Sequence, residues 1–492
     1  MSVTWKMRLA RQVQRVALPL CAACLVLLFF VTLLGRRLNF DESLALRAGY
    51  LALAGEQVRP AFWMPWTAGL GALAHLIKSP EACWLVARTL SVGVPLGAVL
   101  VAMHDKRAST AALVLLFILS NQDYVSHGGE FRYDTSLSIA LLFVLALCRA
   151  RGAAAELLLG AVLGALASHH LKGVYYAAAC FTLLLVPLWL SKMPDQRTVL
   201  RLLAGFCGFW IVWIALSLAL AQADELVSTY GLFYEVGQVE LPPPRRHPLG
   251  ASLKNNSIWW LFVCCGGLFH FFRLRSLSSA KARLEASFPW LLAGASLFFL
   301  VVHPRPWPYL MAAPALLLAL AAGEAWSAAQ TPLSTRVLLC GLLLTLLMAQ
   351  SVWGDARVDA AYRRAAGARW SDEARALRLL RAVSREEDRV LDPSGLAYFR
   401  KPCRKDWYTD TLFRSYAQHR PWMVEPLHLP DDCRFLVSTY RLRMMPKISL
   451  LATQRHFATG TIMGPFLQSG ESISKETKKD AEGLPRTLQN YW

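Results

Sequence analysis

The sequence is poor in charged residues. Asp, Glu, Lys and Arg make up only 17% of its 492 residues, against roughly 25% in ordinary soluble domains. Acidic residues are the scarcest: 33 Asp and Glu stand against 52 Lys and Arg, which gives a net charge of +19. This basicity alone would suggest a nucleic-acid partner, but such a protein has no need of an apolar run as long as 16–34. Together these features exclude a soluble enzyme, a disordered chain and a collagen-like chain, and they give no support to a nucleic-acid partner.

The apolar runs predict a polytopic α-helical membrane protein. A helix needs about 20 apolar residues to cross a hydrocarbon core of about 30 Å. The first run ends in Gly35-Arg36-Arg37 rather than in a small-residue cleavage site, so we expect an uncleaved signal anchor. We predict about eleven spans, at residues 16–34, 84–103, 110–122, 135–148, 153–168, 173–190, 198–220, 257–272, 286–302, 309–326 and 337–353.

The distribution of basic residues predicts the orientation of these spans. With a cytoplasmic N-terminus, the inner segments hold 15 Lys or Arg in 55 residues and the outer segments hold 11 in 108. Positive charge is enriched on the cytoplasmic side, so this orientation is favoured. We therefore expect a transmembrane domain at 1–353, with an outer amphipathic loop at 35–83.

An odd number of spans places residues 354–492 on the outer side of the membrane, as a small α/β domain. Asp-Pro, Lys-Pro and Met-Pro turns separate short strand-like pieces at Arg389–Leu391, Cys433–Tyr440 and Lys447–Ala452. The polar end after about residue 469 is expected to fray. Cys403 and Cys433 lie in this tail, whereas the other nine of the 11 cysteines lie in or beside apolar spans. In an oxidising compartment the pair could form a disulfide, and two unrelated thiols are the alternative.

Four polar clusters lie at the outer ends of the predicted spans. They are Asp41-Glu42, His127–Asp134, His169–Gly173 and His303–Tyr309. Ionisable groups at the membrane edge are costly to desolvate, which makes them candidates for function. Basic side chains at helix ends also reach out to lipid headgroups, so one such cluster does not define a site.

The residue types in these clusters favour transfer of a group from a lipid phosphate. A leaving phosphate needs Lys, Arg, His or a metal ion to offset its charge. An attacking hydroxyl needs a carboxylate to take its proton. The sequence has no Walker loop and no Gly-x-Gly-x-x-Gly unit, which argues against a nucleotide-fuelled pump.

The order of these motifs resembles the GT-C superfamily of integral-membrane glycosyltransferases, and most closely the family 39 and aminoarabinose-transferase-like branch. The resemblance covers about residues 5–330. It is carried by Asp41-Glu42, Met64-Pro65, Arg88, Asp105-Lys106-Arg107, Tyr133-Asp134-Thr135, Leu171-Lys172-Gly173, His303-Pro304-Arg305 through Tyr309, and Pro314.

This resemblance implies roles for individual residues. Asp41 would be the catalytic base or a metal ligand, with Glu42 beside it, and Asp134 would be the second acid. The donor phosphate would be held by Lys172 and Arg305, with Arg132 and His303 as further candidates. A divalent cation, Mg or Mn, shared by Asp41, Asp134 and His169 is compatible with this set.

The chain departs from the branch at one position. Aminoarabinose transferases carry Glu-Lys before the first-loop Pro, whereas this sequence has Trp63-Met64 before Pro65. One acid and one phosphate-binding lysine are therefore missing. Arg245 or Arg246 could bind the donor in place of that lysine.

We expect a glycosyltransferase in the cytoplasmic (inner) membrane of a bacterium, with its catalytic domain at 1–353 and its C-terminal domain, 354–492, in the periplasm. It would move a sugar from a polyprenyl-phosphate donor to a lipid or glycan acceptor on the outer face of the membrane, in cell-envelope or lipopolysaccharide modification. An oligosaccharide ligase or polymerase that uses a lipid-diphosphate donor is the second hypothesis. A lipid or sugar transporter is the third, although transporters often show internal repeats and broken helices at the midplane.

Overall fold

The structure is a computed structural model of the whole chain. The residues that it describes are 19–27, 29, 40–56, 63–103, 108–150, 152–190, 196–224, 226–227, 247–303, 308–328, 377–378, 380–382, 384–392, 397–403, 433–437, 456–459 and 462–465. They belong to two compact units. Unit 1 comprises Met1–Leu33, Arg88–Trp213 and Pro243–Val358, and unit 2 comprises Leu34–Ala87, Ile214–Pro242 and Asp359–Trp492.

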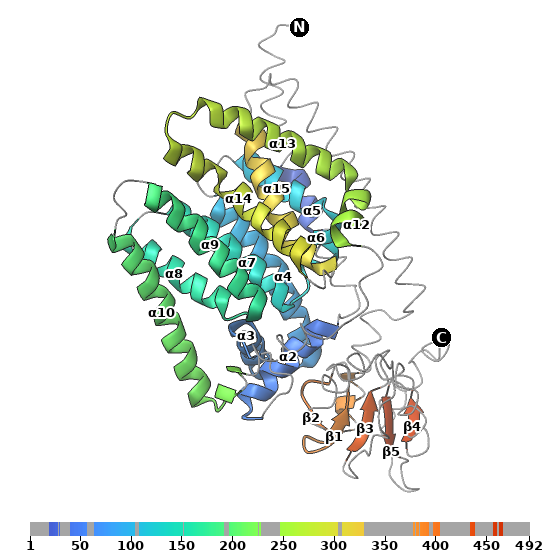
Figure 1. Cartoon of the computed structure of the whole chain (residues 1–492). Helices are drawn as coiled ribbons and strands as arrows, with labels where there is room; N and C mark the ends of the chain where they lie inside the picture. Colours follow the sequence, from blue (N-terminus) through green and yellow to red (C-terminus); the bar gives the residue numbers. More distant parts are fainter. Residues whose placement is uncertain are drawn as a thin grey trace. The chain divides into compact units, whose positions relative to one another are not determined.

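Unit 1 is a helical bundle (Figure 1). Every predicted span between residues 84 and 326 coincides with a helix, while the span at 16–34 is described in part and that at 337–353 lies outside the described residues. The helices are α4 (Pro80–Ala102), which begins in unit 2, α5 (Ala108–Leu119), α6 (Gln122–His127), α7 (Tyr133–Arg149), α8 (Ala153–Ala167), α9 (His170–Leu190), α10 (Gln196–Ala219), which ends in unit 2, α12 (Pro248–Asn255), α13 (Ser257–Ser276), α14 (Ala280–Val302), the 3-10 turn η1 (Pro308–Met311) and α15 (Ala312–Ala328).

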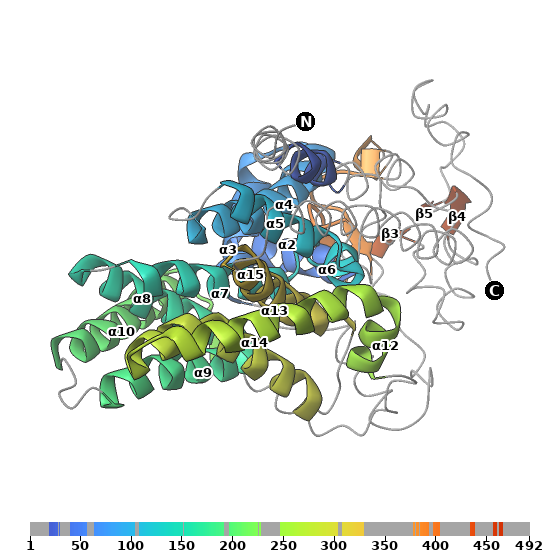
Figure 2. The ribbon, with the colours of Figure 1, turned by 90° about the horizontal axis from the view of Figure 1, so that it is seen from above.

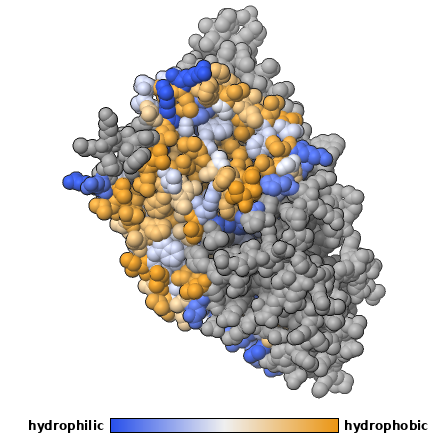
Figure 3. Space-filling model, viewed as in Figure 1, coloured by the Kyte–Doolittle hydropathy of each residue, from blue (hydrophilic) through white to orange (hydrophobic). Residues whose placement is uncertain are grey.

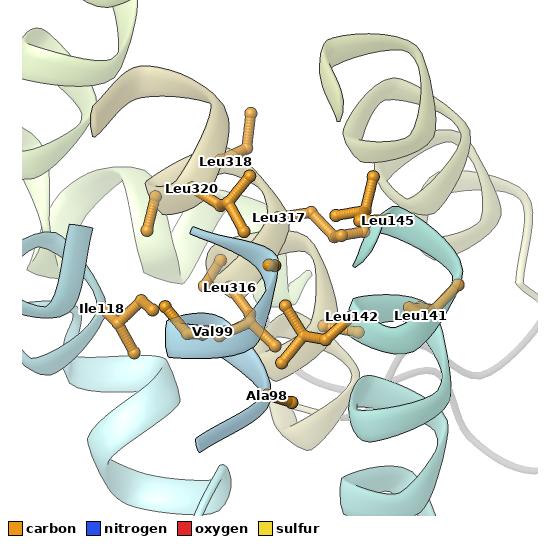
Figure 4. Packing of buried hydrophobic residues seen from close by; sticks show 14 of the residues in the cluster. Ala98, Val99, Ile118, Leu141, Leu142, Leu145, Leu316, Leu317, Leu318 and Leu320 are labelled. Atoms are coloured by element: carbon orange, nitrogen blue, oxygen red, sulfur yellow. The ribbon is translucent and has the colours of Figure 1, made fainter. Parts of the chain in front are cut away.

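The core of unit 1 surrounds α15. This helix is rich in Ala and Leu on all its faces, so it can pack against neighbours on every side. In Figure 4 its leucines interleave with side chains of α4, α5 and α7, among them Val99, Ile118 and Leu142. Gly323 permits a close approach to α5, because a Cβ there would lie 2.6 Å from the Val114 side chain.

Helices α8, α9 and α10 pack together through glycines. Helix α8 lies beside both α7 and α9, and Figure 2 shows α8, α9 and α10 grouped together at the left of the view. A Cβ on Gly160 of α8 would lie 2.1 Å from the Leu202 carbonyl oxygen, and one on Gly205 of α10 would lie 2.0 Å from that of Leu157. Small residues of this kind let two helix backbones touch, a packing mode common in membranes.

The outer surface of these helices is apolar. Figure 3 shows hydrophobic side chains over most of the described surface on the visible face. On α10, for example, Ile211 and Val212 are 68% and 67% exposed. Soluble proteins rarely expose such continuous apolar area. The surface is therefore that of a membrane protein.

The expected number of about eleven spans is not confirmed. Five described helices are long and apolar enough to cross a membrane: Pro80–Ala102, Gln196–Ala219, Ser257–Ser276, Ala282–Val302 and Tyr309–Ala328. The apolar stretches Thr110–Leu119, Ala153–Ala167 and Lys172–Val186 are shorter. At 1.5 Å per residue, a helix of ten residues spans only about 15 Å, half of a hydrocarbon core.

Unit 2 joins the first loop to the C-terminal part of the chain. The loop forms α2 (Phe40–Leu53) and α3 (Pro65–Leu76). Their backbones touch where Gly49 meets Gly71, because a Cβ on Gly71 would lie 2.2 Å from the Gly49 backbone.

The C-terminal part forms a five-stranded mixed sheet in the order β2-β1-β3-β5-β4. Strand β1 (Arg389–Leu391) is parallel to β2 (Lys401–Pro402) and β3 (Cys433–Val437), and β5 (Ile462–Pro465) is antiparallel to β3 and β4 (His456–Thr459). The predicted strand at 389–391 is confirmed, and the one at 433–440 is confirmed for 433–437. The predicted strand at 447–452 lies outside the described residues. Cys403 and Cys433 form a disulfide.

Candidate active site

The candidate site in unit 1 begins at the turn between α6 and α7. Gly128 ends α6, and a Cβ there would lie 2.5 Å from the ring of the buried Tyr124. The chain then reverses so that Glu130 and Arg132 point inward and are buried. Thr135 fixes the turn by donating its hydroxyl to the Glu130 carbonyl oxygen.

Four charged side chains meet at this turn. Arg132 Nη1 donates to Glu130 Oε2 at 3.2 Å, and Arg132 Nη2 lies 3.8 Å from Asp134 Oδ2. Lys172 Nζ of α9 donates to Asp134 Oδ1 at 3.0 Å. Two cations and two carboxylates thus alternate in a nearly buried row. Burying charges is costly unless each is paired, so each member depends on its neighbours.

Aromatic rings line the same row. The guanidinium carbon of Arg132 lies 3.8 Å from the centre of the Tyr309 ring on η1. Lys172 Nζ lies 5.0 Å from that centre and 4.9 Å from the centre of the Tyr133 ring. Cations at such distances from a ring face are attracted by its quadrupole. The rings therefore help to hold both cations in place beside the two carboxylates.

Two features of α9 place Lys172. The helix starts directly beside α8, because the Gly173 position leaves no room for a side chain: a Cβ there would lie 1.9 Å from the Leu166 carbonyl oxygen. Further along, Tyr175 donates its hydroxyl to the Ala295 carbonyl oxygen of α14 at 3.0 Å. Asp134 and Lys172 each lie in the first turn of their helix, and the positive ends of two helix dipoles therefore meet at the site.

His169 lies just before α9 and is neutral. Its Nδ1 donates to the Ala165 carbonyl oxygen at 2.6 Å. Burial lowers the pKa of its ring to about 4, against smaller opposing effects of that hydrogen bond and of Asp134. Because Nδ1 holds the proton, Nε2 is a hydrogen-bond acceptor, and it is buried without a hydrogen-bond partner among the described residues. A ring in this state can accept a hydrogen bond from a hydroxyl group.

A polar network behind α6, which the sequence did not reveal, supports the turn. Asn256, fully buried between α12 and α13, accepts from the Gln122 N–H at 2.8 Å and donates to Asp123 Oδ2 at 3.0 Å. Burial raises the pKa of Asp123, while Ser252 and His127 act in the opposite direction. His127 Nδ1 in turn lies 3.8 Å from Glu130 Oε2. Single polar residues in loops gave no pattern by which this network could be predicted.

The remaining predicted residues of the first loop lie in unit 2. Asp41 is in the first turn of α2, and the structure does not describe its side chain. Glu42 beside it is fully buried. At the two positions before Pro65, where the sequence resemblance would place Glu-Lys, Trp63 and Met64 are buried: Trp63 Nε1 donates to Ser217 Oγ at 2.8 Å, and Met64 precedes α3. In this chain Trp63 and Met64 therefore contribute to the packed interior of unit 2.

The structure describes only some of the remaining predicted phosphate-binding and metal-binding residues. His303 ends α14, where its ring packs on Phe299 at 5.1 Å between ring centres. Arg305, Arg245 and Arg246 lie outside the described residues. Within the part of the chain that is described, no three His, Cys, Asp or Glu side chains are grouped to hold a metal ion. The set Asp41, Asp134 and His169 stays a prediction, because it includes a side chain outside that part.

Comparison with known proteins gives matches of structure alone. No family model and no curated protein matches the sequence. The structure resembles ArnT. ArnT from Cupriavidus metallidurans bound to undecaprenyl phosphate shares 15% sequence identity, with a TM-score of 0.49 over 89% of this chain and 87% of that chain. For the apo state of the same protein the identity is 17% and the TM-score 0.48, over 77% and 73%.

Proposed function

We propose that this protein is a membrane glycosyltransferase of the GT-C type. It takes a sugar from a polyprenyl-phosphate donor and passes it to a lipid or glycan acceptor of the cell envelope. The observation that carries the proposal is the buried row in which Arg132 and Lys172 flank Asp134 under the ring of Tyr309. A phosphate ester at the end of an apolar chain is a ligand that such a row, at the end of lipid-exposed helices, can accommodate.

The proposed chemistry is a single displacement at the anomeric carbon. The acceptor oxygen forms a bond to that carbon while the bond from the carbon to the phosphate oxygen breaks. The electron pair of the broken bond leaves with polyprenyl phosphate, and Lys172 and Arg132 offset the charge that develops there. The proton of the acceptor goes to Asp41, the role that the family resemblance assigns to it. His169 Nε2 accepts a hydrogen bond from a sugar hydroxyl.

A reconstituted transfer assay tests this proposal. The purified chain in lipid vesicles is given a polyprenyl-phosphate sugar and an envelope glycolipid extract, and mass spectrometry follows the acceptor. We expect transfer by the parent chain, none by Asp41→Asn, and normal transfer by Asp224→Asn, which changes an exposed acid of the same unit. Near-normal turnover by Asp41→Asn would remove that residue from the reaction.

The donor class is the finer part of the proposal. One phosphate needs fewer cations than two, and the row of unit 1 supplies Arg132 and Lys172, each already beside a carboxylate. This balance favours a monophosphate donor over the diphosphate of an oligosaccharide ligase or polymerase. Offering both donors side by side separates the two. Movement of the lipid across the vesicle without covalent change would instead indicate a transporter.

The proposed location is the outer face of the bacterial cytoplasmic membrane, with the C-terminal residues in the periplasm. The excess of basic residues in the predicted inner segments supports it. The Cys403–Cys433 disulfide also supports it, because disulfides persist in oxidising compartments. Labelling of single cysteines placed at 104–107 and at 470–480 in intact cells, with a reagent that does not cross membranes, tests this orientation.

A further inference from the structure

The C-terminal residues 389–392 and 397–403, here called the docking segment, contact the first loop at three points, two of them on helix α2. Arg47 Nη1 donates to the Asp392 carbonyl oxygen at 2.8 Å. The rings of Tyr50 and Tyr398 meet edge to face at 5.4 Å between centres. Beyond the helix, Lys401 Nζ lies 3.3 Å from Glu56 Oε1. All three partners of the loop come from 47–56, and all three partners of the tail come from 392–401.

Tyr398 is the centre of this contact. Its side chain is 1% exposed, although it comes from a short loop between two strands. Its ring also meets the ring of Trp84 edge to face at 5.9 Å, and Trp84 is fully buried. On the opposite side, His75 of α3 stacks on Tyr50 at 4.3 Å and donates from Nε2 to the Tyr50 carbonyl oxygen at 2.9 Å. One buried tail residue therefore packs against rings of both α2 and α4.

The docking segment is itself held firmly. Strand β1 lies between β2 and β3, and the Cys403 N–H donates to the Val390 carbonyl oxygen at 3.1 Å. Arg400 donates from Nη2 to the Ser384 carbonyl oxygen at 2.9 Å. The disulfide closes the segment onto β3. Because the docking segment is fixed by these bonds, it can also fix the position of the residues that it contacts.

Helix α2 needs such support. It has 14 residues, and isolated helices of this length are marginal in water, so tertiary contacts must hold it. Its first turn carries Asp41 and Glu42, and Arg47 lies less than two turns further along the same helix. A shift at the docked end of a rigid helix moves its other end as well.

We propose that the docking segment positions α2, and that Tyr398 is the central positioning residue. The C-terminal tail then contributes to the structure of the first loop and is not an independent domain. The effect of docking on catalysis rests on the proposed function, because it assumes that α2 carries the base. The docking itself does not.

Amide hydrogen exchange of the full chain in detergent micelles tests the docking directly. In Tyr398→Ala, we expect exchange of the peptide 40–56 to rise at least about tenfold, while Tyr398→Phe, which keeps the ring, stays near the parent. Glu387→Gln, an exposed change near the same segment, is the matched control. If Tyr398→Ala raises exchange within 384–403 and leaves 40–56 unchanged, the segment does not position α2.

The ion pair between Lys401 and Glu56 gives a second test, in which the substitutions are not expected to unfold the protein. Lys401 and Glu56 are 56% and 30% exposed, and exposed pairs contribute little, so each charge reversal should raise exchange of 40–56 by about two- to fivefold. The double variant Glu56→Lys with Lys401→Glu should restore it. Failure of the double variant to restore protection would overturn the contact.

Transfer assays separate this inference from the proposed function. If both hold, Tyr398→Ala lowers kcat and leaves the donor KM unchanged, and Tyr398→Phe recovers kcat. If the parent chain shows no transfer but the exchange results hold, the docking stands and the proposed function falls. If transfer is found and Tyr398→Ala changes neither kcat nor exchange, the docking proposal falls alone.

Discussion

Replacing Lys172 by Met removes one charge from the row in unit 1 and keeps most of the side-chain volume. At 3.0 Å from Asp134 Oδ1, and with an effective dielectric constant of about 20, the attraction between the two charges is about 5 kcal/mol. Measured costs of removing one partner of a buried pair are about 3–5 kcal/mol. We therefore expect the Lys172→Met variant to be less stable than the parent, because the buried charge of Asp134 has lost this cation. If Lys172 also holds the donor phosphate, transfer should fall about 100- to 1,000-fold.

The double variant Lys172→Met with Asp134→Asn separates the two effects. It removes both charges, so thermal stability in detergent should return to within about 1 kcal/mol of the parent. Transfer should stay low, because no cation has been restored. A double variant that recovers both stability and transfer would show that the pair is only structural, and the proposed phosphate site would be refuted. Lys172→Arg, which keeps the charge, is the matched control.

Three further predictions concern stability. The folded pKa of His169, about 4, lies below the ordinary value of about 6.5, so the unfolded chain is protonated first as the pH falls. About 3 kcal/mol of stability, fully present above pH 6.5, should be lost between pH 6.5 and 4, and a His169→Gln variant should lack this loss in thermal scans. Gly205→Ala should destabilise by about 1–3 kcal/mol, since its Cβ would lie 2.0 Å from a carbonyl oxygen of α8. Gly208→Ala on the same helix meets nothing within 4 Å and should be neutral. Cys403→Ser should cost about 3–4 kcal/mol, as expected for a crosslink whose ends are 30 residues apart, measured by denaturation of the tail with and without reductant.

Features with a local cause were predictable from the sequence. Apolar runs gave the helices from 84 to 326, and Asp134 and Lys172 were singled out because ionisable residues at span ends are costly. The number of spans was less predictable, since stretches such as 110–119 are apolar because they are buried among other helices. Hydropathy does not distinguish burial in protein from burial in lipid.

Features with a long-range cause were not predictable. Asn256 joins α6 across 134 residues, and Tyr398 joins the first loop across more than 300, yet neither residue lies in a periodic pattern. Strands β4 and β5 have four residues each, too few for an alternation to stand out. The stacking of Arg132 on Tyr309 depends on where η1 lies, which no local rule fixes.

The central position of α15 has a consequence for biogenesis. Its neighbours α5 and α7 are synthesised about 200 residues earlier, and they leave the ribosome with the surface that will contact α15 still uncovered. Until that late helix arrives, lipid or a chaperone must occupy its place. A ribosome that stalls before residue 312 therefore releases a bundle that lacks its central helix, which is a natural substrate for membrane quality control.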